Sequence, residues 1–207
     1  MNDIQPVTQL YGATGYGSAI IEIIYTLAGE PYQLIDVNGF EEPGSARNRL
    51  LQVNPLAQVP ALQLPDGRVM TESAAIALQL LDRHPQLAPA DRTRFYHLLI
   101  WLVANVYPTF TYGDITSRWT LLGERELLDS TERYRQQLWL WLESQITSPG
   151  PYLFGAKISL LDAYLAVMVA WRPQKAWFAE HTPKIMAIAQ QVRELENIKP
   201  IIVRNEL

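Results

Sequence analysis

Glu72 and Ser73 place an acid and a hydroxyl side by side at the start of an amphipathic segment. Apolar residues recur at helical spacing from Glu72 to Arg83, so Ser73 falls in the first turn of a predicted helix. The backbone N–H groups and the dipole of a helix start favour an anion, and the serine hydroxyl adds one more donor. An acid near a helix start is also common for purely structural reasons, so the pair alone does not establish a ligand.

The second candidate feature is a proline loop upstream, Asn54-Pro55-Leu56-Ala57-Gln58-Val59-Pro60. Pro60 ends the loop and opens a short predicted strand. A proline has no N–H for a sheet ladder, so Pro60 alone indicates no more than the start of an edge strand. Considered together with Glu72-Ser73 downstream, the loop favours a binding site over a purely structural role.

The elements that must position these residues alternate between strands and helices. Gly29 is the predicted C-cap of the first helix, Ser45 is a candidate N-cap of the second, and Asp66-Gly67 predicts a hairpin turn. A parallel βαβ unit followed by a hairpin predicts a mixed four-stranded sheet. The expected strands are Val7–Tyr11, Tyr32–Val37, Ala61–Leu64 and Arg68–Met70, and the expected helices are Ser18–Leu27, Ser45–Leu51 and Glu72–Arg83.

The second part of the chain shows helical patterns only. The segment from His84 to Ala90 has no periodicity and contains two prolines, so it is predicted to be a linker. We therefore expect domains at residues 1–83 and 91–207, joined by a linker at residues 84–90. The expected helices are Asp91–Asn105, extended or bent at Pro108, then Glu124–Ile146, Leu160–Ala170 and, as the last clear one, Pro183–Glu194.

Ser159-Leu160-Leu161-Asp162 has the pattern of a capping box at the start of the most apolar helix. In such a box the Ser159 hydroxyl accepts the backbone N–H of Asp162, while the Asp162 carboxylate accepts the backbone N–H of Ser159. Ile158 and Ala163 occupy the positions of a hydrophobic staple. The motif is predicted to be structural and to lie away from any active site.

The proline loop, the Glu72-Ser73 pair and the capping box together resemble the cytosolic glutathione transferase family, and the resemblance extends over nearly the whole chain. It implies a thioredoxin-like N-terminal domain with a mixed four-stranded sheet, followed by an all-helical C-terminal domain, which is an α+β and all-α fold class. It also implies a homodimer in which the α/β domain of one subunit contacts the helical domain of the other.

The resemblance implies glutathione as the co-substrate. In the family the bond equivalent to Val59–Pro60 is cis, so that the Val59 backbone pairs with the cysteinyl unit of glutathione as an added strand. The γ-glutamyl carboxylate is expected at Ser73, and the γ-glutamyl ammonium is expected to face Glu72. Gln58 is expected to reach the glycyl end of the ligand.

Members of the family hold the thiol of glutathione as a thiolate. A free thiol has a pKa of about 8.5, so a hydrogen-bond donor and a helix N-terminus must lower it. The resemblance places this donor between the end of the first strand and the start of the first helix. The candidate hydroxyls there, in order of preference, are Ser18, Tyr16, Thr14 and Tyr11.

The leading hypothesis is a glutathione transferase whose bound thiolate attacks a small hydrophobic electrophile. The resemblance implies that Tyr107 and Tyr112 line the pocket for this second substrate. Of the positions at which relatives carry a donor, two fall here on Gly15 and Gly17 and one on Tyr11, so a glutathione-binding protein with little transferase activity is the alternative. A glutathione-dependent isomerase, peroxidase or disulfide reductase is a further alternative.

Composition narrows the remaining classes. Among the 207 residues 48% are hydrophobic and 18% are charged, as expected of a globular protein with a sizeable core. A net charge of −4 without a basic run argues against nucleic acid. The absence of cysteine excludes disulfides and a protein thiol nucleophile, and no metal is expected. Met1–Pro6 lacks the features of a signal peptide, and no apolar stretch reaches the roughly 20 residues of a membrane span, so we expect a cytoplasmic protein with no membrane partner.

Overall fold

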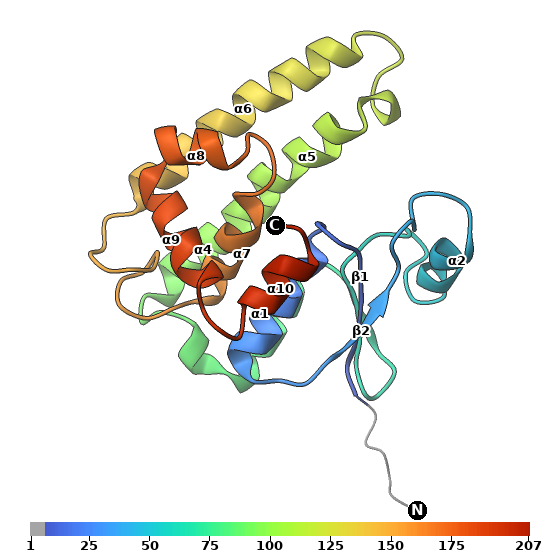
Figure 1. The fold of residues 1–207 in the computed structure, drawn as a ribbon, viewed down its shortest axis with the longest axis horizontal. Coiled ribbons are helices and arrows are strands. Elements are labelled where there is room, and N and C mark those ends of the chain that lie inside the picture. The colour runs from blue at the N-terminus through green and yellow to red at the C-terminus, as the bar shows by residue number, and fades with distance from the viewer. Residues whose placement is uncertain (1–6) are drawn as a thin grey trace, which may run out of the picture. The chain divides into compact units, whose positions relative to one another are not determined.

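The computed structural model describes residues 7–207, and contacts divide the chain into two units (Figure 1). The first unit comprises the residues up to Leu87 together with Val192–Leu207. The second unit comprises Ala88–Gln191. The last residues of the chain therefore belong, by contact, with the α/β unit rather than with the helical one.

The domain boundaries expected at residues 1–83, 84–90 and 91–207 remain a prediction. The contact-based division differs from them mainly at the end of the chain, which the helical periodicity assigned to the second domain. The segment Met1–Pro6, which was expected to carry no signal peptide, lies outside the described residues.

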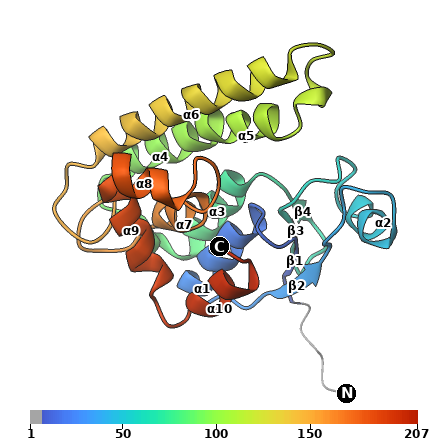
Figure 2. The same cartoon turned by 45° about the horizontal axis from the view of Figure 1, so that its top comes forward.

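A mixed sheet forms the frame of the first unit. In the described chain it has four strands in the order β2-β1-β3-β4 (Figure 2). β1 runs parallel to β2 and antiparallel to β3, and β3 runs antiparallel to β4. Gly67 has a φ of +86° in the turn between β3 and β4, so the predicted Asp66-Gly67 hairpin is confirmed. The strands are β1 (Gln9–Gly12), β2 (Gln33–Asp36), β3 (Ala61–Gln63) and β4 (Val69–Met70).

Helices cover both faces of this sheet, with α1 and α3 on one side and α2 on the other (Figures 1 and 2). Gly29 ends α1 with a φ of 70°, so this predicted C-cap is confirmed. Ser45 is the first residue of α2 rather than its N-cap, because Gly44 precedes it and no side chain caps this helix. The short α10 was not predicted, since it is too brief to show a clear period. The helices are α1 (Ser18–Ala28), α2 (Ser45–Leu51), α3 (Ser73–Arg83) and α10 (Lys199–Arg204).

The regular structure of the second unit is helical. A π-helical turn at Leu102–Val106 joins α4 to α5, and within it the Tyr107 N–H bonds to Leu102 O. This wide turn ends two residues before Pro108, which has no backbone N–H to donate. The sequence predicted an extension or a bend of the helix at Pro108. The sequence analysis missed the short α8. The helices are α4 (Arg92–Trp101), α5 (Tyr107–Asp114), α6 (Glu124–Gln145), α7 (Leu160–Met168), α8 (Lys175–His181) and α9 (Pro183–Arg193), the last of which ends in the first unit.

The start of α7 confirms the predicted capping box. Ser159 N–H and Ser159 Oγ donate to Asp162 Oδ2 at 2.7 and 2.8 Å, and Leu153 N–H donates to Asp162 Oδ1 at 2.9 Å. Asp162 is fully buried, and this burial raises the pKa of its carboxyl to about 6, although the hydrogen bonds lower it. The two units together confirm the predicted fold class, a thioredoxin-like α/β part followed by a helical part.

Candidate functional site

One edge of the sheet in the first unit brings the candidate segments together. The β1–β3 and β3–β4 registers place the end of β1, the start of β3 and the end of β4 level with one another. Continued by one residue for β1–β3 and by two residues for β3–β4, these registers align Gly12 with Pro60 and Pro60 with Glu72. The loop after β1, the proline loop and the start of α3 therefore open on the same edge of the sheet.

The proline loop is braced from inside by a buried asparagine. Asn54 Nδ2 donates to Gln58 O at 2.9 Å, and Asn54 Oδ1 accepts the Leu56 N–H at 3.1 Å. The Val59–Pro60 peptide bond is cis, as the resemblance implied. Val59 is half-buried against the core, whereas Gln58 is exposed. Sequence reasoning quoted Asn54 within the motif but did not assign it this role.

Glu72 and Ser73 lie at an open helix start. Glu72 precedes α3 with φ 62° and ψ 106°, a conformation that costs a non-glycine residue about 1–3 kcal/mol. No described side chain caps this helix, and the Ile76 N–H bonds to Glu72 O at 3.1 Å. The N–H groups of Ser73, Ala74 and Ala75 precede that bond in the first turn, where a helix leaves donors without intrahelical acceptors. Such a start can hold an anion.

The loop from Gly12 to Gly17 leads into α1, and Ser18 opens the helix from a buried position. Its hydroxyl donates to Ala13 O and accepts the Ala13 N–H, both at 3.1 Å, and the residue is 1% exposed. Ser18 was the first choice for a donor to a bound sulfur, and this stays a prediction; in the structure its hydroxyl is engaged with the backbone of the loop. Tyr11, the last choice, is buried, and its OH donates to Gln9 Oε1 at 3.4 Å.

Thr14 and Tyr16 are half-buried in the same loop. Thr14 N–H donates to Asn38 Oδ1 at 2.9 Å, and Asn38 Nδ2 donates to Thr14 Oγ1 at 3.1 Å. Because Thr14 Oγ1 accepts this bond, its own proton can be donated to another acceptor. The Tyr16 ring meets the Phe40 ring edge-on at 5.3 Å. Sequence reasoning missed Asn38, since nothing in the local pattern links it to Thr14.

Tyr107 and Tyr112 lie on different faces of α5 in the second unit, because residues five apart on a helix are rotated by about 140°. The half-buried Tyr107 ring lies 5.7 Å from Trp171 and 6.5 Å from Phe110. Tyr112 is exposed and lies 4.9 Å from Trp119. The two tyrosines therefore belong to two separate aromatic groups.

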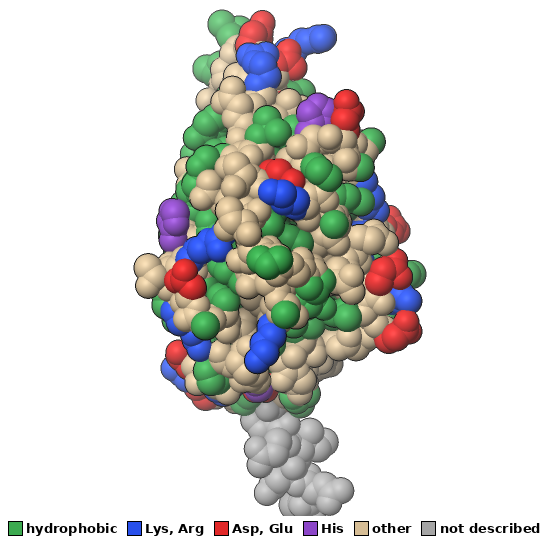
Figure 3. Space-filling model, turned by 90° about the vertical axis from the view of Figure 1, so that its left-hand side faces the viewer, with side chains coloured by type: hydrophobic (Ala, Val, Ile, Leu, Met, Phe, Trp, Pro, Cys, Tyr) green, Lys and Arg blue, Asp and Glu red, His purple; other side chains and the backbone are tan. Residues whose placement is uncertain are grey.

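Between residues 7 and 207, no group of three or more His, Cys, Asp or Glu residues is placed to hold a metal ion. No helix in the described part of the chain is long and apolar enough to cross a membrane. Acidic and basic side chains are interspersed on the face shown in Figure 3. A cavity of about 650 Å³ in the second unit, between the end of α6 and α9, contains none of the predicted site residues. The cytoplasmic location remains a prediction.

Comparison with known proteins agrees with these features. Residues 18–83 match the protein family described as glutathione S-transferase, N-terminal domain. The chain is 46% identical to the uncharacterized GST-like protein YncG of Escherichia coli (strain K12) over 203 residues, which cover 96% of this chain and 98% of that protein. It is 29% identical over 159 residues to a maleylacetoacetate isomerase of Pseudomonas aeruginosa, covering 70% of this chain and 71% of the isomerase.

A solved structure has the same fold. A glutathione transferase homologue from Sulfitobacter, crystallised with bound glutathione, superposes with a TM-score of 0.84. The alignment covers 98% of this chain and 100% of the homologue at 24% sequence identity. The likeness supports the α/β and helical architecture of both units.

Proposed function

The chain belongs to the glutathione S-transferase family, and on this premise we propose that it binds glutathione at the sheet edge of the first unit and transfers it to a small electrophile. The observation that carries the proposal is the common edge on which the proline loop, the open start of α3 and the hydroxyl-bearing loop meet. Glutathione has a group for each of them, namely an extended peptide, a charged γ-glutamyl end and a thiol.

The γ-glutamyl group suits the start of α3. Its carboxylate would accept the Ser73 hydroxyl and the first backbone N–H groups of the helix, whose dipole contributes about 0.3–1 kcal/mol at an exposed site. Its ammonium would face the exposed Glu72 carboxylate. The positive φ of Glu72 supports this assignment, because strained backbone is concentrated at ligand sites. The Val59 backbone would pair with the cysteinyl unit, and Gln58 would contact the glycyl end.

As hydrogen-bond donors to the sulfur of glutathione, we rank Thr14 and Tyr16 before Ser18. Thr14 has a hydroxyl proton to donate, and both residues are half-buried in the loop beside the proline loop. The hydroxyl of Ser18, in contrast, is engaged with Ala13. A hydroxyl bond to sulfur and the N-terminus of α1 would together stabilise the thiolate, and each unit by which the thiol pKa falls corresponds to about 1.4 kcal/mol.

In the proposed reaction the thiol first releases its proton to solvent. The thiolate sulfur then forms a bond to an electrophilic carbon of the second substrate, and the leaving group departs with its electron pair. The expectation that Tyr107 and Tyr112 line the pocket of a small hydrophobic substrate remains a prediction, because the structure places them on different faces of α5. The proposed reaction requires no metal.

Calorimetry tests the proposal directly. The wild type is expected to bind glutathione and to turn over an aromatic halide with it. Thr14→Val or Tyr16→Phe is expected to lower kcat and to raise the pH midpoint of activity while leaving the glutathione Kd nearly unchanged. No heat of glutathione binding to the wild type would overturn the proposal, whereas binding without turnover on a panel of electrophiles would select the carrier function.

A glutathione-dependent isomerase is the second candidate. The 29% identity to a maleylacetoacetate isomerase favours it. In an isomerase the thiolate adds to the substrate, a bond rotates, and the thiolate is expelled again, so glutathione is not consumed. Conversion of a cis substrate to its trans isomer at constant total glutathione would establish this function over the transferase.

A homodimer in which the α/β unit of one subunit contacts the helical unit of the other is proposed, and the second unit offers exposed apolar residues for such a contact. α4 exposes Tyr96 and Ile100, one turn apart, and the Trp101 ring of α4 packs 4.1 Å from the Trp141 ring of α6. α6 exposes Leu140 next to that contact. Exposed apolar residues on neighbouring helices favour a protein–protein surface. Sedimentation should give about twice the chain mass, and a species of 23.6 kDa at micromolar concentration would contradict the dimer.

A further inference from the structure

Glu22 places a carboxylate in the apolar helix α1. The residue is 1% exposed, and a buried carboxylate is strongly destabilising unless it is paired. Tyr32 OH donates to Glu22 Oε2 at 3.2 Å, and Asn205 Nδ2 donates to Glu22 Oε1 at 2.9 Å. The Arg204 guanidinium forms an ion pair with Glu22 Oε2. Two of these partners come from the end of the chain.

Hydrogen bonds also shape the end of the chain itself. After α10, Glu206 N–H bonds to Val203 O at 3.2 Å, and Leu207 N–H bonds to Ile202 O at 3.1 Å. This pair of bonds is a Schellman motif, in which glycine usually supplies the left-handed residue. Glu206 takes that position with a φ of 55°. The chain end is therefore turned back onto α10 in a defined conformation.

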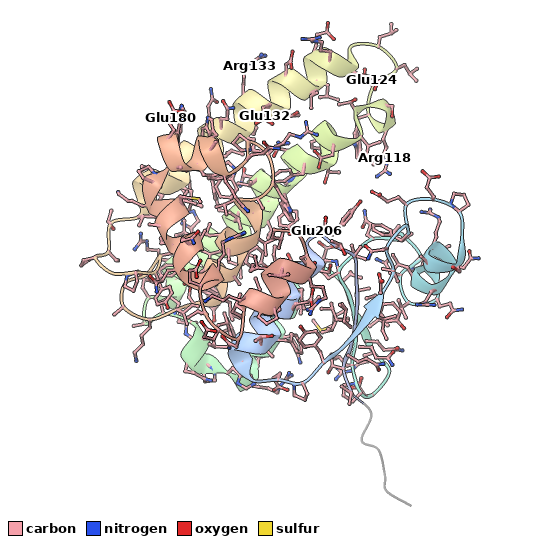
Figure 4. The ribbon with its side chains drawn as sticks, viewed as in Figure 1. Arg118, Glu124, Glu132, Arg133, Glu180 and Glu206 are labelled. Carbon is pink, nitrogen blue, oxygen red and sulfur yellow. The ribbon has the colours of Figure 1, made fainter. Side chains whose placement is uncertain are left out.

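This turned end lies against the loop that carries Thr14 and Tyr16. A Cβ atom at Gly15 would stand 3.8 Å from Asn205 O, which places the two backbones side by side. α10 runs alongside α1 in both ribbon views, and Glu206 lies beside the loop that follows β1 (Figures 1, 2 and 4). All of these residues belong to the first unit.

The loop thus has two braces, at the adjacent residues Thr14 and Gly15. Asn38 holds Thr14 through two hydrogen bonds, at 2.9 and 3.1 Å. The Asn205 carbonyl stands beside Gly15, and the Asn205 side chain donates to Glu22. Of the residues proposed to donate to the thiol, Thr14 is held directly by Asn38, and Tyr16 follows Gly15 in the loop.

We propose that Glu22 is a positioning residue of the thiol site. Through Arg204 and Asn205 it holds the end of the chain against the loop from Gly12 to Gly17, and so it keeps the thiol donor in the orientation that the reaction needs. The inference rests on the proposed function, because it concerns how the donor of that site is held. Loss of this brace should affect ionisation of the thiol and its rate of attack, but not the anchoring of glutathione at the start of α3.

A double variant tests this role. Glu22→Leu with Arg204→Met removes both charges, so it leaves no unpaired charge in the interior. Asn205→Ala is the milder variant, which removes one contact to Glu22 and keeps the ion pair. Lys199→Met is the matched control. Lys199 lies on α10 with Arg204, and the substitution breaks its exposed ion pair with Glu196, at 2.8 Å.

Four readouts separate positioning from folding and from binding. Amide hydrogen exchange of residues 13–17 is measured without ligand, and glutathione affinity is measured by calorimetry. The pKa of the bound thiol is read from thiolate absorbance against pH, and kcat is measured at neutral pH. In the double variant we expect loop exchange about tenfold faster, a raised thiol pKa, a kcat about tenfold lower and a Kd within about twofold of wild type. The control should match the wild type in all four.

The outcomes are distinguishable. An unchanged thiol pKa and kcat in the folded double variant would overturn the positioning role, whatever the loop exchange shows. If the double variant does not fold, the same four measurements are made on Asn205→Ala. Smaller changes of the thiol pKa and kcat in the same direction would support the role of Glu22, and unchanged values would overturn it. If the wild type does not bind glutathione, the proposed function fails, and the role of Glu22 toward the thiol fails with it. The exchange data then still show whether the chain end braces the loop.

Discussion

Two helices of this chain begin at an acid and a serine, and they begin in opposite ways. At α7, Ser159 precedes Asp162, whose buried carboxylate turns back to accept the Ser159 N–H and hydroxyl. At α3 the acid comes first, and Glu72 is exposed at a positive φ while no described side chain caps the helix. One start is closed on itself, and the other is open.

The difference concerns where the N–H groups of each helix find acceptors. A helix start that satisfies its donors internally stabilises the fold and has little left to offer a ligand. A helix start with a strained residue and no capping side chain lowers the stability of the fold. Its free N–H groups can instead bind the anionic group of a ligand. We therefore expect substitutions at α7 to change stability and substitutions at α3 to change binding.

The largest effect is expected for Asp162→Ala. The substitution leaves the Ser159 and Leu153 groups buried without their acceptor, so the free energy of unfolding should fall by about 3 kcal/mol or more. For a chain of this size the melting temperature should drop by roughly 6–12 °C. Glu196→Ala, which removes an exposed acid, is the control and should leave the thermal unfolding curve in place. An unchanged curve for Asp162→Ala would refute the capping role.

The pH dependence of stability sharpens the same contrast. Burial raises the pKa of Asp162 from 3.8 to about 6, so the folded state binds the proton more tightly than the unfolded state between these values. The part of the stability that comes from this tighter proton binding is greatest below pH 4 and is lost as the pH rises through 6, and it is separate from the contribution of the capping hydrogen bonds. Two pKa units correspond to about 3 kcal/mol.

Denaturant unfolding from pH 4 to pH 7 measures this effect. The difference in unfolding free energy between wild type and Asp162→Ala should narrow by up to about 3 kcal/mol as the pH rises. A difference that stays constant over this range would show that the Asp162 carboxyl titrates at its ordinary value.

At the open start, Ser73→Ala should weaken glutathione binding by about 1–3 kcal/mol, the usual loss when a charged group loses a hydrogen-bond donor. The melting temperature should hardly change, because the hydroxyl is not needed to cap the helix. Ser45→Ala is the matched control, since Ser45 also begins a helix without capping it. Equal glutathione affinities of wild type and Ser73→Ala in calorimetry would contradict the proposal that the start of α3 binds the ligand.

The smallest expected effect is that of Glu72→Gly, which should raise the stability of the protein and lower its affinity for glutathione. Glu72→Gly removes the side chain that is strained at φ 62°, so the protein should become more stable by about 1 kcal/mol. The same change removes the carboxylate proposed for the γ-glutamyl ammonium, so glutathione affinity should fall. Glu72→Gln keeps the strain and loses the charge, so it should weaken binding without the gain in stability. A loss of stability in Glu72→Gly would contradict the strain argument.

Much of the fold followed from periodicity and turn chemistry. The mixed sheet was predicted because strand-forming runs alternate with an amphipathic helix and end in the Asp66-Gly67 hairpin. The short helices α8 and α10 were missed, because each spans too few residues to show a period. Contacts group Val192–Leu207 with the α/β unit, and a helical pattern in the sequence does not tell which neighbours a helix packs against.

For the candidate site, residue type and spacing selected segments that the structure brings to one edge of the sheet, and the hydroxyl that serves the thiol stays a prediction. Ser18 seemed suited to hold a sulfur because it opens α1. In the structure Ser18 is buried, and its hydroxyl both donates to Ala13 O and accepts the Ala13 N–H. A sequence shows that a hydroxyl is present, but it does not show whether the backbone nearby has already engaged it.

By itself the sequence determined the features that depend on a few consecutive residues. These are the capping box at Ser159 and Asp162, the C-cap at Gly29 and the hairpin, where the residue types dictate the local backbone and its hydrogen bonds. Only the tertiary structure decided the pairing of Thr14 with Asn38 and of Glu22 with the end of the chain. Those partners are distant in sequence, and they meet because the sheet and the helices bring them together, so no local pattern could reveal them.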